Sequence, residues 1–357
     1  MIYYIILCYA EVIIISSHKT KIWHDYQNKK HIRIITRYNK KLKRTILKHL
    51  NETEYLRSEH IIENGRGSYV ADAPIVFSVI KNPSETIYFF NIIISNLKSN
   101  NINLRYTFNL SNVAEITTDA LMYLLAIVKN FKKEKIKKCE FIVKIPTNQE
   151  VMKIIKESGF LNYTYNRTVD IIPMVDKIFI QTGNNTDGIL AKKVCDFVQK
   201  NLCINMQQTN ALYKTLIELM SNTYHHAYND DSVLNKSWYI FSEFSNNKII
   251  IIFLDVGSGI PTTINKRVYE TIDVNNVIIK DSEYILSAFE GKNRTETQFE
   301  HRGNGLPEIY SYCKNDDLKN FVVVSGKGIC KISKKNIKED IKNKLLGTVY
   351  RWEIDAI

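Results

Sequence analysis

A helix-forming stretch followed by an apolar strand places the strongest constraint on how this chain folds. Residues Leu212–Ala227 have the spacing of an amphipathic helix, on which Glu218 and Asn222 lie one turn apart on the same face. Residues Ile249–Leu254 are an uninterrupted apolar run, which predicts a buried strand. The segment Asp255–Gly259 follows at once and contains two glycines, the residues that let a backbone turn sharply and approach a ligand closely.

Two later segments add glycine-rich and hydroxyl-bearing positions. Gly303 and Gly305 stand just before the apolar stretch Leu306–Tyr310 and suit a phosphate-binding loop at the start of a helix. Near the end of the chain, Thr348 follows a glycine and opens a predicted strand. In this order the four segments resemble the ATP-binding motifs of the GHKL superfamily, which includes gyrase, the heat-shock chaperone, histidine kinases and the mismatch-repair ATPase.

The resemblance implies an α+β fold of the Bergerat type, with helices on one face of a largely antiparallel sheet, and a role for each motif residue. Asn222 would ligate Mg²⁺ through its side-chain oxygen, and Glu218 would accept a proton from an attacking water or hydroxyl. Asp255 would read the adenine amino group. The other expected contacts to ATP come from the glycines, from Thr348 and from basic residues around a polar lid: His226, Gly257, Gly259, Lys292, Arg294, Gly303, Gly305 and Thr348.

Each motif taken alone has a simpler interpretation. An acid and an amide four residues apart usually form a solvated helix face. Asp-Val-Gly-Ser-Gly after a strand is usually a turn, and Arg-Gly-Asn-Gly is usually a loop. The occurrence of all four in order favours nucleotide binding. His225 and His226 show no zinc-binding spacing, and we interpret them as helix residues at the rim of the pocket.

Residues 71–165 alternate strand and helix patterns, which predicts a small α/β layer. We expect strands at Leu104–Leu110 and Glu140–Ile145, and helices at Asp119–Lys132 and Val151–Phe160. The segment Asn109–Leu121 resembles the central motif of STAS domains, the anti-sigma-factor-antagonist fold.

In that family a serine in the corresponding turn can be phosphorylated. Here Thr117 and Thr118 occupy the turn, and Asp119 and Ala120 stand where Ser and Gly are more common in the family. A simple helix cap formed by Thr117 or Thr118 explains the same residues without regulation.

The predicted organisation is a basic N-terminal extension (1–70), the STAS-like domain (71–165) and the GHKL-type ATP-binding domain (166–357). The net charge of +12 and the basic residues 19–48 raise nucleic acid as a partner. The six cysteines form no CxxC pair, which favours a reducing, cytoplasmic location. The apolar stretch Ile2–Ile15 is too short for a membrane helix and is interrupted by Glu11, so we expect no membrane association.

We therefore expect a protein that binds Mg-ATP and hydrolyses it to drive a conformational or assembly switch in a bacterial regulatory or defence system, acting with a protein partner or as a homodimer. One alternative is an anti-sigma-type Ser/Thr protein kinase that acts on a STAS-like partner or on itself. A histidine kinase fits less well, because no histidine lies in a recognisable phosphoacceptor module. The chain could also use nucleotide only as a structural ligand, or act as a nucleic-acid-binding regulator through its basic N-terminus.

Overall fold

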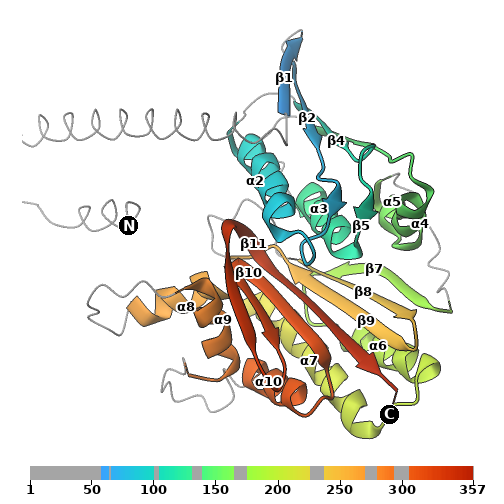
Figure 1. The fold of residues 1–357 in the computed structure, drawn as a ribbon, viewed down its shortest axis with the longest axis vertical. Helices are drawn as coiled ribbons and strands as arrows, with labels where there is room; N and C mark the ends of the chain where they lie inside the picture. Colours follow the sequence, from blue (N-terminus) through green and yellow to red (C-terminus); the bar gives the residue numbers. More distant parts are fainter. Residues whose placement is uncertain are drawn as a thin grey trace, which may run out of the picture. The chain divides into compact units, whose positions relative to one another are not determined.

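The computed structural model in Figure 1 describes residues 58–63, 66–99, 104–130, 139–164, 175–225, 237–269, 280–292 and 305–356. All of them belong to one compact unit, Leu56–Ile357. The predicted basic extension (1–70) lies outside the described residues up to residue 57, whereas its residues 58–63 and 66–70 are described and form strands; the predicted boundary near residue 165 also lies outside the described residues. None of the described helices is long and apolar enough to cross a membrane.

The N-terminal part of this unit is a four-stranded sheet with helices beside it. Its strand order is β1-β2-β4-β6; β1 is antiparallel to β2, and β2, β4 and β6 run parallel. The strands are β1 (Ser58–Glu63), β2 (Arg66–Asp72), β4 (Leu104–Asn109) and β6 (Cys139–Lys144), with the short pair β3 (Val76–Phe77) and β5 (Glu115–Ile116). The helices are α2 (Pro83–Ser99), α3 (Thr118–Asn130), α4 (Gln149–Glu157) and α5 (Phe160–Thr164). The predicted alternation of strands and helices is therefore present.

The C-terminal part is a five-stranded sheet in which all neighbouring strands are antiparallel. Its order is β10-β11-β9-β8-β7. The strands are β7 (Lys177–Gly183), β8 (Trp238–Ser245), β9 (Lys248–Asp255), β10 (Lys319–Ile332) and β11 (Ile337–Asp355). The helices are α6 (Gly188–Asn201), α7 (Met206–His225), α8 (Ile260–Tyr269), α9 (Asp281–Phe289) and α10 (Gly305–Lys314). The described residues thus form a mixed helix and strand protein, in agreement with the α+β expectation.

Both faces of the five-stranded sheet are covered, because strand side chains alternate between them. On β9, Ile251 and Phe253 join the core formed with α6, α7 and α10, whereas Ile252 and Leu254 join the core formed with α2 and α3. Figure 1 shows α2 and α3 on one side of the sheet and α6 and α7 on the other. The N-terminal layer therefore packs on the sheet face that lies opposite α7.

The composition of α3 explains this second cover. Every residue from Ala120 to Ile127 is buried, so the helix is apolar on all sides rather than along one stripe. A helix of this kind has to be enclosed, and here the N-terminal elements and the five-stranded sheet enclose it together.

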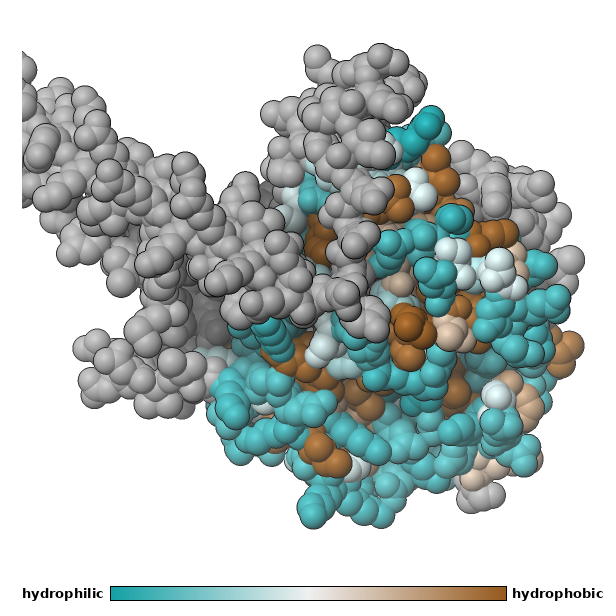
Figure 2. Space-filling model, turned by 45° about the horizontal axis from the view of Figure 1, so that its top comes forward, coloured by the Kyte–Doolittle hydropathy of each residue, from teal (hydrophilic) through white to brown (hydrophobic). Residues whose placement is uncertain are grey.

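On the surface drawn in Figure 2, apolar residues appear as scattered patches among hydrophilic ones.

Candidate functional site

One row of side chains crosses the sheet and contains two of the predicted site residues. In the strand register, Ser325 of β10 is paired with Thr348 of β11, Thr348 with Asp255 of β9, and Asp255 with Trp238 of β8. Paired residues on neighbouring strands lie on the same face of a sheet. Asp255 lies two residues after Phe253, which packs in the core with α7, so the row is on the α7 face.

The carboxyl group of Asp255 is buried and only partly satisfied. Its residue is 7% exposed, and Oδ1 accepts a hydrogen bond from the amide of Gly257 at 2.8 Å. Among the described residues, no donor reaches Oδ2. Burial raises the pKa of Asp255 to about 7, against the opposing effect of the Gly257 amide. An acceptor of this kind is suited to a ligand that brings a hydrogen-bond donor.

The glycines around Asp255 act differently from one another. Gly259 has φ +81°, as expected for a residue that turns the backbone sharply, and a Cβ there would lie 2.9 Å from Ser325 Oγ. Gly257 does not use positive φ, so that part of the prediction was wrong; its amide instead donates to Asp255. Gly347 has φ +91°, and a Cβ on it would lie 2.1 Å from the carbonyl oxygen of Asp255. The backbones before Thr348 and at Asp255 can approach this closely only because residue 347 is glycine.

Ser325 connects these backbone turns, although no sequence motif marks it. Its hydroxyl accepts a hydrogen bond from the amide of Ile260 at 2.9 Å and donates to the carbonyl of Gly347 at 3.0 Å. It also lies 2.9 Å from the hydroxyl of Thr348. The serine therefore joins the turn after β9 to the start of the Thr348 segment.

Helix α7 presents Glu218 and Asn222 together, as predicted. The Asn222 amide donates a hydrogen bond to the Glu218 carboxylate, and no described residue donates to the side-chain oxygen of Asn222. Burial raises the pKa of Glu218 and the nearby charge of Glu308 adds to this, while the Asn222 hydrogen bond opposes it. A raised pKa makes a carboxylate a better proton acceptor near neutral pH.

Gly305, the first residue of α10, lies directly against Glu218. A Cβ at position 305 would lie 1.7 Å from Cδ and 1.9 Å from Oε1 of Glu218, so a side chain there would overlap the carboxyl group. The carboxyl group thus lies at the N-terminus of α10, where the helix dipole favours negative charge. This contact explains why the position is glycine.

Tyr350 lies where the charges of both carboxyl groups reach it. It is buried, its hydroxyl is hydrogen-bonded to Thr348, and burial together with the charges of Asp255 and Glu218 raises its pKa well above the ordinary value. Because both charges act on the same phenol, Asp255 and Glu218 face one region from β9 and from α7. Tyr350 was not predicted, since a tyrosine in an apolar strand has the appearance of a core residue.

A cavity of about 200 Å³ lies between α7 and α10, next to Glu218. Asp255 does not line it. Its wall includes Glu218 and Gly305 from the prediction, and six residues that were not predicted: Tyr213, Lys214, Ile217, Glu308, Ile309 and Tyr312. Lys214 of α7 and Glu308 of α10 form an ion pair at 2.6 Å, and the Tyr312 hydroxyl donates to Glu308 at 2.5 Å. The cavity therefore adjoins Glu218 and has an ion pair on its wall.

Four predicted ATP contacts remain: three lie outside the described residues, and the fourth, Lys292, is paired elsewhere. His226, Arg294 and Gly303, and most of the predicted lid, lie outside the described residues. Lys292 is exposed and forms an ion pair with Glu290 at 2.5 Å, and this contact raises its pKa. No described contact joins Lys292 to Glu218 or to Asp255.

The STAS-like turn lies on the other side of the sheet. The hydroxyl of Thr117 donates to Asp119 Oδ1 at 2.7 Å, and the amide of Val79 donates to the same oxygen at 2.9 Å. Helix α3, which begins at Thr118, packs on the face opposite α7. Within one chain, therefore, the sheet separates Thr117 and Thr118 from Glu218.

A scan of the sequence against protein-family models gave no match, and a search among curated proteins gave none either. What the chain does must be inferred from its own residues.

Proposed function

We propose that this chain binds Mg-ATP on the α7 face of the five-stranded sheet and hydrolyses it. The observation that carries the proposal is the pairing of Asp255 with Thr348 on the sheet face that packs against α7, the helix of Glu218. An adenine amino group is a donor that suits the unsatisfied oxygen of Asp255, and the Thr348 hydroxyl lies beside it. The same residues carry the resemblance to the GHKL superfamily.

The phosphate end of the nucleotide would lie toward α7 and the start of α10. The side-chain oxygen of Asn222 suits Mg²⁺, a metal that takes oxygen ligands and usually keeps phosphate oxygens and water as the others. The described residues contain no cluster of three or more His, Cys, Asp or Glu side chains that could hold a metal ion, so Mg²⁺ would depend on the bound phosphates. Glu218 would take the proton from the attacking water.

Hydrolysis is favoured over transfer of phosphate to the turn at Thr117 and Thr118 of the same chain, because the sheet stands between that turn and Glu218. A kinase reaction would need a hydroxyl from a second molecule, with the cavity between α7 and α10 as its route to Glu218. We infer that ATP turnover changes the conformation or assembly of the protein, and that the N-terminal STAS-like layer is the part that responds.

The test starts with nucleotide affinity. At pH values above the Asp255 pKa of about 7, where the carboxyl group is ionised, Asp255→Asn replaces a pure acceptor by a group that is partly a donor. Loss of a buried hydrogen bond to a charged group costs about 1.5–3 kcal/mol, so the Kd for Mg-ATP measured there should rise tenfold or more. Asp316→Asn is the control, because Asp316 is a partly exposed carboxylate paired with Lys334. Equal affinity in folded Asp255→Asn and wild type would overturn the assignment of the site.

The fate of the phosphate is followed in the same samples with ATP labelled on its γ-phosphate. We expect free phosphate and no label on the protein. Label on wild-type protein that is absent from Glu218→Gln would instead establish a kinase that acts on its own chain or on a second copy.

A further inference from the structure

Strand β11 contains a bulge directly before Thr348. In the pairing with β10, Ser325 is opposite Thr348 but the next residue, Gly326, is opposite Leu345. Leu346 and Gly347 are therefore extra residues that have no partner in this register. On the other side, the ladder with β9 begins only at Thr348. Bulges of this kind redirect side chains and are frequent beside functional sites.

Two side chains, one from each face of the sheet, bind the carbonyl groups of the bulge. The Ser325 hydroxyl donates to the carbonyl of Gly347 at 3.0 Å. The Tyr123 hydroxyl, from α3 of the N-terminal layer, donates to the carbonyl of Leu346 at 2.5 Å. Tyr123 is fully buried, so its ring is held in place by the core around α3. The bulge is thus held from both faces of the sheet, by Ser325 on the α7 face and by Tyr123 of the N-terminal layer on the other.

A charge on β11 also acts on the same face of α3. Asp119 lies one helical turn before Tyr123, and the positive charge of Arg351 acts on it, so Arg351 lies near Asp119. Leu346 and Arg351 stand on either side of Thr348 in β11. Helix α3 therefore contacts the strand before Thr348 and acts electrostatically on it after Thr348.

We propose that Tyr123 is a positioning residue for the nucleotide site: by holding the Leu346 carbonyl it sets the bulge, and the bulge sets the hydroxyl of Thr348 beside Asp255. This inference rests on the proposed function and deepens it. The N-terminal layer then acts on adenine recognition through the hydrogen bond from Tyr123 to Leu346, although it lies on the opposite face of the sheet.

The experiment compares Tyr123→Phe with Tyr163→Phe. Both substitutions remove a tyrosine hydroxyl that donates to a backbone carbonyl, but the partner of Tyr163 is Ile180, in the edge strand β7. We expect the Kd for Mg-ATP to rise about five- to tenfold in Tyr123→Phe and to stay within twofold of wild type in Tyr163→Phe.

A double-substitution cycle separates positioning from general loosening of the fold. If Tyr123 acts through Thr348, then in a Thr348→Val background Tyr123→Phe should change the Kd by less than twofold. A full further loss in that background, an unchanged Kd in Tyr123→Phe, or an equal loss in Tyr163→Phe would overturn the positioning role. Wild-type protein that binds no adenine nucleotide would overturn the proposed function itself.

Discussion

Asp255 and Glu353 are buried carboxylates on neighbouring strands of one sheet, but they lie on opposite faces. Asp255 is paired with Thr348, and Glu353 is five residues farther along β11, an odd number, so its side chain points the other way. Asp255 has one backbone amide as its described partner, and burial raises its pKa to about 7. Burial would also raise the pKa of Glu353, but hydrogen bonds from Asn320, Lys248 and Arg351 outweigh it and lower the pKa to about 2.

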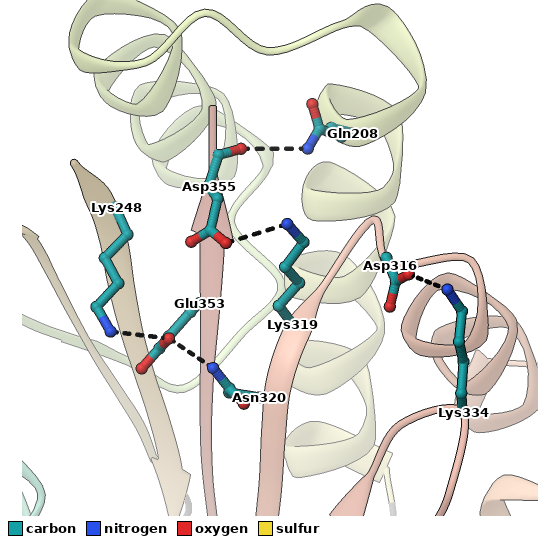
Figure 3. Close-up of polar contacts among 8 residues, drawn as sticks. All are labelled: Gln208, Lys248, Asp316, Lys319, Asn320, Lys334, Glu353 and Asp355. Atoms are coloured by element: carbon teal, nitrogen blue, oxygen red, sulfur yellow. Dashed lines mark hydrogen bonds and ion pairs between the residues drawn. The ribbon is translucent and has the colours of Figure 1, made fainter. Parts of the chain in front are cut away.

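Figure 3 shows two of these donors, Lys248 and Asn320, converging on Glu353 from β9 and β10. A buried carboxylate with several charged and amide donors stabilises the fold, whereas one left with a free oxygen costs stability. The two carboxylates therefore differ in how completely their oxygens are hydrogen-bonded. Glu353, on the face toward α2 and α3, is held by charged and amide donors, whereas Asp255, on the face toward α7, keeps one oxygen that no described donor reaches and that a ligand can use.

The largest effect should come from Glu218→Gln. If the α7 face carries the chemistry, removing the general base should lower ATP turnover about 10²–10⁴-fold while the Kd for Mg-ATP changes little. Steady-state phosphate release and nucleotide titration measure the two quantities. Glu308→Gln is the control, because Glu308 lines the same cavity but is held by Lys214 and Tyr312. Equal turnover losses in both variants would show that only the charge of the cavity matters.

The second-largest effect should be the change that Asp255 causes in the free energy of unfolding as the pH rises. Its folded-state pKa of about 7 lies above the ordinary value of 3.8, so the folded protein holds this proton more tightly than the unfolded chain does. The contribution of Asp255 to the free energy of unfolding should therefore be most favourable below pH 4 and should fall as the pH rises to 7, by on the order of 4 kcal/mol. Denaturant titrations at several pH values measure this fall. The fall should be absent in Asp255→Asn, and the same fall in that variant would assign it to another group.

Local pattern in the sequence was enough for the individual elements and for part of the site. The 3.6-residue spacing placed Glu218 and Asn222 on one face of α7, and the apolar run of β9 placed Asp255 at its end. The pairing of Asp255 with Thr348 does not follow from spacing, because strand order and register depend on contacts between distant segments. Only the resemblance to a known family put those two residues in one site.

The residues that were missed are those whose role depends on this long-range pairing. Ser325 and Tyr123 are ordinary strand and helix residues until the bulge at Leu346 gives their hydroxyls a carbonyl to bind. Helix α3 was predicted, but its enclosure on all sides was not. Gly347 was the one local sign of the bulge, and a single glycine does not specify one.

Glu353 should produce the opposite pH effect, somewhat smaller in size. Its folded-state pKa of about 2 lies below the ordinary 4.5, so its contribution to stability is present above pH 4.5 and is lost as the pH falls through 2. Glu353→Gln should lower the free energy of unfolding at pH 7 by about 3 kcal/mol and should remove most of the loss between pH 4.5 and 2. Denaturant titration at pH 7 and pH 3 measures both. Unchanged stability at pH 7 would mean that the donors around Glu353 are solvated instead of paired.

The smallest effect should come from Lys214→Met, which breaks the ion pair with Glu308 across the cavity. Both side chains are partly exposed, at 57% and 41%, and exposed ion pairs contribute about 0–1 kcal/mol because water and salt screen them. The free energy of unfolding should therefore change by less than about 1 kcal/mol at pH 7, and added salt should make this change smaller. Lys334→Met, which breaks the exposed pair with Asp316, is the matched control. A loss as large as that of Glu353→Gln would contradict the comparison, since the α7 face would then also depend on its charge pairs for stability.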